Sequence, residues 1–205
     1  MNPKNIHLMI ILVAVFAIAS LNTYCDSLNV DLVGKLAGGA PQRVEVVGDY
    51  AYVGSGYMFT VFDVSDKGNP VQIAYLDIEA RDLRVIGDYA YIAGSWKGFS
   101  IVDVSDPVNP SEVGWCDIFG YSTGIDVVGD HAYLAANAGG LRIIDVSDPA
   151  NPTEVGYCDA PDYAYEISVS SGYAYIADRW NGLSIIDVSD PTSPMEVGYF
   201  ETPGV

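Results

Sequence analysis

An internal repeat of about 40 residues constrains the fold of this 205-residue chain more than any other feature. A tight-turn dipeptide recurs at intervals of 39 or 42 residues, and each copy leads into a run containing Ala-Tyr and an aliphatic residue. The four dipeptides are Gly48-Asp49, Gly87-Asp88, Gly129-Asp130 and Ser171-Gly172. A period of this length indicates one supersecondary unit that is stacked several times.

Each unit has the pattern of four short strands. The first two flank the dipeptide, because a two-residue hairpin turn needs positive φ and favours Gly, Asn or Asp. The third ends in Asp-Val-Ser-Asp, and a Pro-containing turn leads to the fourth. Four strands in about 40 residues are typical of a propeller blade. We therefore predict an all-β fold, a β-propeller of four-stranded antiparallel blades, at about residues 40–79, 80–120, 121–162 and 163–202.

The third-strand segments also carry a family resemblance. Ile101–Pro107 and Ile143–Pro149 resemble the LVIVD repeat, a β-propeller family of bacterial and archaeal surface proteins. The resemblance covers roughly residues 40–204, and the first copy departs from it only slightly, at Phe62 and Lys67. It implies a surface propeller and supplies no catalytic residues that could be carried over.

The ends of the propeller domain, residues 26–205, predict an incomplete ring. Residues 30–36 resemble an outer strand whose blade is otherwise missing, and the chain stops where another unit would begin. An open arc exposes about six apolar side chains on each end face, at roughly 1.5–3 kcal/mol each. Since this approaches the stability of a whole domain, we expect a fragment of a ring of about six to eight blades. A closed four-bladed ring and an oligomer are the alternatives.

Residues 1–25 have the pattern of a signal peptide. Lys4 precedes an apolar run of twelve residues, Leu8–Ala19, which is too short for a membrane span of about 20 but fits a signal sequence. An uncleaved anchor is an alternative, and Cys25 leaves lipid attachment open. We expect an extracellular or cell-surface protein with no membrane insertion beyond this leader.

Charge and composition exclude several partners. Nine Lys and Arg residues against 27 Asp and Glu give a net charge of −18, whereas nucleic acids and anionic lipids require basic clusters. Two His and three Cys leave little for metal sites, and we expect no cofactor or metal. Repeated pairs such as Asp103 and Asp106 could bind Ca²⁺, but roles at strand ends and in turns explain them better.

Two further motifs are interpreted as structural. Cys116 and Cys158 hold equivalent positions in successive blades, too far apart for a disulfide, and we expect buried free thiols. Residues 120–124 match G-x-S-x-G, but the strand–turn–helix context of a hydrolase and a suitable histidine base are missing.

The connections that differ between copies predict the functional face. The turns after the first and third strands hardly change and share one end of the blades, whereas the other connections vary and share the opposite end. Trp, Tyr and basic residues gather in these variable connections, where function is commonly carried and interfaces are anchored. We predict a protein- or glycan-binding face formed by Trp96, Lys97, Arg179, Trp180, Asn181, Tyr57, Tyr121 and Tyr163. For the two Trp residues, packing against their own hairpin is the alternative.

We therefore expect a secreted or cell-surface propeller that is not an enzyme and that binds a protein or a glycan. The alternative is an extracellular enzyme, a lyase or hydrolase acting on polysaccharide at an axial pocket. The acids available to it are Glu79, Asp82, Asp126, Asp162 and Glu166. A third alternative is a purely structural module of a surface layer.

Overall fold

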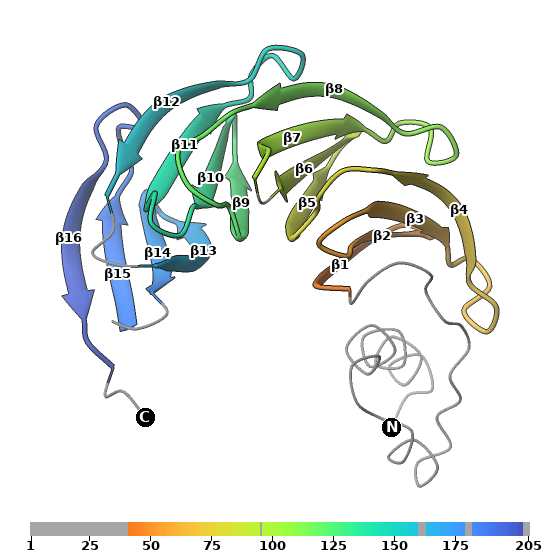
Figure 1. The fold of residues 1–205 in the computed structure, drawn as a ribbon, viewed down its shortest axis with the longest axis horizontal. Helices are drawn as coiled ribbons and strands as arrows, with labels where there is room; N and C mark the ends of the chain where they lie inside the picture. The colour runs from red at the N-terminus through yellow and green to blue at the C-terminus, as the bar shows by residue number, and fades with distance from the viewer. Residues whose placement is uncertain (1–40, 95, 160–162, 179–181, 203–205) are drawn as a thin grey trace, which may run out of the picture.

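The chain folds into four antiparallel sheets that follow one another around an open arc (Figure 1). The structure, a computed structural model, describes residues 41–94, 96–159, 163–178 and 182–202. The first strand of each sheet lies on the concave side of the arc and the fourth strand on the convex side. The described sheets do not close into a ring. The prediction of a β-propeller with four four-stranded blades is confirmed.

All four blades have the same strand order, and the strand bounds repeat with the sequence period. The first blade contains β1 (Arg43–Val47), β2 (Tyr50–Gly54), β3 (Phe59–Asp63) and β4 (Val71–Leu76). The second contains β5 (Asp82–Ile86), β6 (Tyr89–Gly94), β7 (Gly98–Asp103) and β8 (Ser111–Cys116). The third contains β9 (Gly124–Val128), β10 (His131–Ala135), β11 (Leu141–Asp145) and β12 (Thr153–Cys158). The fourth contains β13 (Ala164–Ser170), β14 (Tyr173–Asp178), β15 (Gly182–Asp187) and β16 (Met195–Phe200).

The repeated turn residues have the backbone geometry that the sequence predicts. Gly48, Gly87 and Gly129 have φ of 61°, 59° and 59° between the first two strands of their blades. In the fourth blade, where Ser precedes Gly, both residues of the turn have positive φ, 53° at Ser171 and 81° at Gly172. Positive φ at the turn matches the right-handed twist of the flanking strands.

The repeated Asp pairs stabilise strand ends and turns, as the sequence predicts. The Asp103 carboxylate accepts a hydrogen bond from the Ser105 backbone N–H at 2.8 Å, and Asp106 accepts one from Val108 at 3.2 Å. Bonds from the Ser105 hydroxyl and amide hold the pKa of Asp103 below its ordinary value. The other three blades make the same two backbone bonds.

An apolar core lies at each of the three junctions between blades. At the second junction, Tyr91, Phe99 and Ile101 of the second blade pack against Ile125 and Leu134 of the third. All five side chains are at most 8% exposed. Equivalent residues form the other two cores, so each blade is stabilised mainly by its neighbours.

Glycine on the convex strand lets the next blade approach closely. A Cβ atom at Gly114 would overlap the carbonyl oxygen of Pro149, in the turn between β11 and β12. Gly156 meets Pro191 of the fourth blade in the same way. These glycines are therefore part of the second and third junctions, whereas Ala74 holds the equivalent position at the first junction.

The G-x-S-x-G match and the two cysteines have structural roles, as predicted, but the burial of the cysteines differs from the prediction. Ser122 of the G-x-S-x-G match is fully buried and donates to the Gly98 carbonyl oxygen, and no helix follows it in the described chain. Cys116 and Cys158 are free thiols, but they are half-buried rather than buried, because each lies at the convex edge of a junction core. Partial burial raises the pKa of both thiols.

The predicted signal peptide and the predicted outer strand at 30–36 lie outside the described residues. Within the part of the chain that the structure describes, no helix has the length and apolar character needed to cross a membrane.

Candidate functional site

The connections that vary between copies lie at one end of the blades, which we call the loop face. In the first blade, Gly54 pairs with Phe59 across the connection between β2 and β3, and Phe59 pairs with Leu76, the last residue of β4. Asp63 and Val71 pair at the opposite end, where the turn backbone also bonds to Asp49. The predicted division into one constant end and one variable end is therefore present in the structure.

An aromatic cluster stands at the loop face of the second blade. Trp96, between β6 and β7, is 80% exposed, and its ring meets Tyr121 edge-to-face with centroids 5.3 Å apart. The Arg81 guanidinium lies 4.5 Å from the centroid of the Tyr121 ring. Such contacts hold large flat side chains in place without burying them. At 80% exposure the Trp96 ring is not packed into its own hairpin, which argues against the capping alternative. We call Trp96, Tyr121 and Arg81 the aromatic platform.

The other predicted site residues are dispersed or already engaged. Lys97 forms an ion pair with Glu112, with Nζ 2.7 Å from Oε2. Tyr57 and Tyr163 are 75% and 45% exposed in connections of the first and fourth blades. Among the predicted residues that the structure describes, only Trp96 and Tyr121 make a ring contact with each other. Arg179, Trp180 and Asn181 lie outside the described residues.

A pocket of about 420 Å³ opens beside the platform, at the loop-face end of the concave strands. Thr123, at its wall, donates from its hydroxyl to the Tyr165 carbonyl oxygen at 2.8 Å and so ties the third and fourth blades together. The lining residues are Pro41, Gln42, Arg43, Arg81, Asp82, Thr123, Tyr165 and Glu166. Arg81 belongs to both the pocket and the platform. It was not among the predicted site residues, and its place in the connection before β5 was the only signal for it.

Several ion pairs, and hydrogen bonds from backbone N–H groups to carboxylates, lie on the concave side of the arc. Arg84 contacts Asp82 and Asp126, at 3.3 and 3.5 Å, and Arg43 contacts Asp82 at 3.1 Å. Asp82 is 3% exposed and accepts from the Ile125 N–H at 2.9 Å. Asp126 accepts from Val169 in the fourth blade at 2.7 Å. Much of the basic charge near the loop face is thus neutralised internally.

The acids proposed for an enzyme have different surroundings. Asp82 and Asp126 are held in the ion pairs described above, and Glu79 accepts from the Trp96 backbone N–H at 3.3 Å. Desolvation raises the pKa of Glu166, Asp82 raises it further, and Arg43 and Arg84 act in the opposite direction. Asp162 lies outside the described residues. No group of three or more His, Cys, Asp or Glu that could hold a metal occurs in the described part of the chain.

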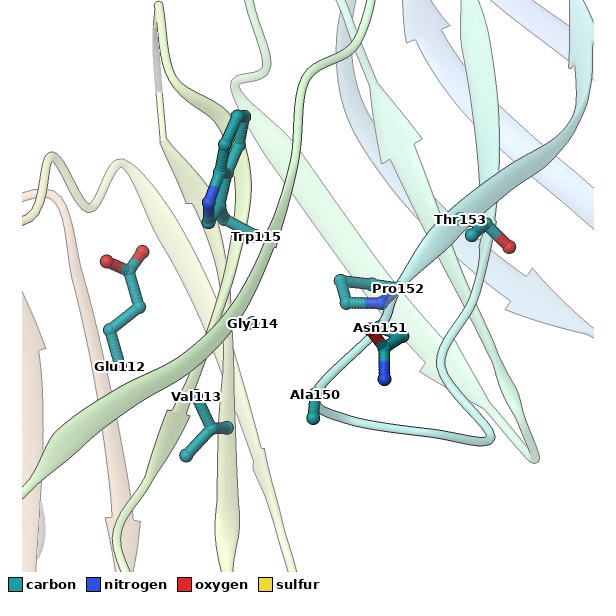
Figure 2. A pocket seen from close by; sticks show the side chains of 8 residues that line it. All are labelled: Glu112, Val113, Gly114, Trp115, Ala150, Asn151, Pro152 and Thr153. Carbon is teal, nitrogen blue, oxygen red and sulfur yellow. The ribbon is translucent and has the colours of Figure 1, made fainter.

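A second pocket, of about 480 Å³, lies on the convex side at a junction between blades (Figure 2). One wall is β8, with Glu112 and Trp115, and the other is the turn of the third blade, with Asn151 and Pro152. This groove follows from the close approach at Gly114. It contains none of the predicted site residues.

Sheets stacked as blades around an arc define the class of this protein as a β-propeller. The family model described as the LVIVD repeat matches residues 38–76, 79–118, 119–160 and 161–202, and the chain belongs to the LVIVD-repeat family. No curated protein matches the chain.

Two solved structures share the fold. The computationally designed Ika4 protein is 7% identical, with a TM-score of 0.61 over 74% of this chain and 92% of that chain. The computationally designed Ika8 protein is also 7% identical, with a TM-score of 0.63 over 80% of this chain. This chain covers only half of the Ika8 chain.

Proposed function

We propose that this chain is an exported propeller without catalytic activity that binds a glycan at the loop face. The observation that carries the proposal is the aromatic platform, in which the 80% exposed ring of Trp96 is held by Tyr121 beside a polar pocket. The leader in the sequence supports export, and a glycan is a ligand encountered outside the cell.

The chemistry of the platform and pocket suits a neutral sugar. Exposed aromatic rings provide flat surfaces for the C–H faces of a sugar ring, as they do for other apolar groups. The pocket adjoining them contains carboxylates, guanidinium groups and a hydroxyl, the few polar groups with which a binding site orients a ligand. Because Arg43 and Arg84 are paired with Asp82 and Asp126, a neutral glycan fits better than an anionic one.

The test is binding of neutral polysaccharides and oligosaccharides to the wild-type chain and to Trp96→Ala and Tyr121→Ala. We expect at least about tenfold weaker binding in Trp96→Ala, about 1.4 kcal/mol, because exposed Trp residues commonly dominate recognition. Trp115→Ala is the matched control, since Trp115 is 58% exposed on the convex strand β8. Circular dichroism confirms that each variant folds.

Unchanged binding in Trp96→Ala, or an equal loss in Trp115→Ala, contradicts this assignment. Failure of every neutral glycan, together with Trp96-dependent capture of a purified surface protein, would instead favour a protein partner at the same platform.

The polysaccharide lyase or hydrolase is the second candidate, and Glu166 favours it. Its raised pKa and its place in the pocket are features of a general acid. Asp82 and Asp126, which could assist it, are occupied by ion pairs and by backbone N–H groups of the next blade. New reducing or unsaturated ends from a polysaccharide, abolished by Glu166→Gln, would establish the enzyme and overturn the non-enzymatic proposal.

A further inference from the structure

The fourth blade exposes a surface that the other three blades bury. Tyr175 is 37% exposed, whereas its counterparts in the earlier blades, Tyr52, Tyr91 and Tyr133, are 3%, 8% and 5% exposed. Leu183 is half-buried, although Phe59, Phe99 and Leu141 at the same position have no exposure.

The same difference extends across β15 and β16. Ile185 is half-buried, while Ile101 and Ile143 at its position are fully buried. Val197 and Phe200 are 50% and 65% exposed. We call this surface the terminal face: Tyr175, Leu183, Ile185, Val197 and Phe200. It is the apolar side of a blade junction without the blade that would cover it.

Gly198, on β16, is a further sign that the terminal face is built to receive a blade. Its counterparts Gly114 and Gly156 have no room for a Cβ atom, because the turn of the next blade lies against them. A Cβ atom at Gly198 would meet only the Ile185 side chain, at an ordinary 3.7 Å. The described chain therefore has the glycine that admits a neighbouring turn, but not the turn.

The first blade offers the complementary surface at the other end of the arc. Val44 and Val46 occupy the positions that Ile125 and Val127 occupy in the second junction core, where both of the latter are at most 9% exposed. Val44 is half-buried, and Val46 is 41% exposed.

The two end blades of the arc also carry the acceptor and donor groups that form the polar contacts of an internal junction. Glu166 holds the position of Asp82, which accepts from the Ile125 N–H of the next blade. The counterpart of that donor in the first blade is the Val44 N–H. Pro70, in turn, occupies the position of Pro152, which lies against Gly114.

We infer that the terminal face binds the first blade of a second copy of this chain, which is the oligomer that the sequence leaves open as an alternative to a longer ring. Two copies joined head to tail form two equivalent junctions, and a symmetric pair of this kind closes without leaving an end face exposed. A chain cannot make this contact with itself, because its end blades lie at opposite ends of the open arc (Figure 1).

The test is the mass of the full chain in solution, measured by light scattering over a range of concentrations. Wild type is expected at twice the mass of one chain. Gly198→Val is expected to fold normally but to dissociate at least 100-fold more readily, because its side chain occupies the place of the incoming turn. Tyr75→Val is the matched control, since Tyr75 is 57% exposed on the convex strand β4 and lies outside every junction core. Tyr175→Asp is a second variant that places a charge on the terminal face.

A dimer that both terminal-face variants disrupt, and that Tyr75→Val leaves intact, supports the proposal. A wild-type monomer would overturn it, as would a dimer insensitive to Gly198→Val and Tyr175→Asp. A monomer in which hydrogen exchange shows β15 to be protected would assign the terminal face to another segment of the same chain and also overturn it. Because the readout is mass, its outcome is independent of whether the loop face binds a glycan.

Discussion

The third junction and the terminal face consist of equivalent residues but have different surroundings. Tyr133, at the third junction, and Tyr175 follow the same turn in successive repeats, yet they are 5% and 37% exposed. A repeat unit carries both halves of a junction, and each half is buried only when the adjacent unit is present. This difference shows that the burial of a side chain in this chain depends more on the position of its blade along the arc than on its residue type.

Truncating these two tyrosines sharpens the comparison and has the largest expected effect. Tyr133→Ala removes a buried aromatic side chain from a packed core, and we expect a loss of about 4 kcal/mol in the free energy of unfolding. Tyr175→Ala removes a partly exposed side chain, and we expect a loss of about 1 kcal/mol. Urea denaturation in the Gly198→Val background measures both without a contribution from dimerisation. Equal losses in this monomeric background would show that another segment of the same chain covers the terminal face.

A second comparison concerns the acid at the start of the concave strand. Asp82→Ala leaves Arg43 and Arg84 without this carboxylate and removes the acceptor of the Ile125 N–H. We expect a loss of about 3 kcal/mol, because breaking a buried ion pair strands its partners. Glu166→Ala, the equivalent change in the last blade, should cost less than about 1 kcal/mol. Chemical denaturation of the two variants decides whether the concave ion pairs stabilise the junctions, and similar small losses in both would show that they do not.

The fold could be predicted from the sequence because every local signal agreed with the repeat. Gly87 marks the turn, Tyr91 recurs in the core, and Asp103 ends the third strand in the register that the structure shows. Each of these roles depends on residues close in sequence or one period away. A period repeated four times therefore predicts them together.

The candidate site could be predicted only in part, because its contacts join connections that are unrelated in sequence. Trp96 and Tyr121 were predicted as exposed loop residues, but their ring contact and the position of Arg81 above Tyr121 depend on how three connections meet. Arg84 lies next to a variable connection in the sequence, yet it forms ion pairs with two carboxylates on the concave side. No pattern of spacing indicates which charges neutralise one another across blades.

The smallest expected effect is a pH-dependent one at Glu166. Because the folded chain raises the pKa of this carboxyl above its ordinary 4.5, mainly by desolvation, ionisation of Glu166 opposes folding. The destabilisation is absent below the ordinary pKa, develops as pH rises towards the raised folded-state pKa, and is complete above it. Glu166→Gln should therefore be more stable than its parent at pH 7, by less than about 1 kcal/mol, and equal to it below about pH 4.5.

Thermal unfolding of the Gly198→Val chain with and without Glu166→Gln, between pH 3.5 and 7, measures this difference. Glu45→Gln is the comparison at an internal junction. Desolvation raises the pKa of Glu45 as well, but its carboxylate accepts the Val85 N–H of the next blade at 3.1 Å. Since an amide oxygen is a weaker acceptor than a carboxylate, the gain in stability at Glu45 should be smaller than at Glu166. If the stability gained by Glu166→Gln persists unchanged at pH 3.5, ionisation of Glu166 is not its cause. Glu166 would then differ from Glu45 in packing instead.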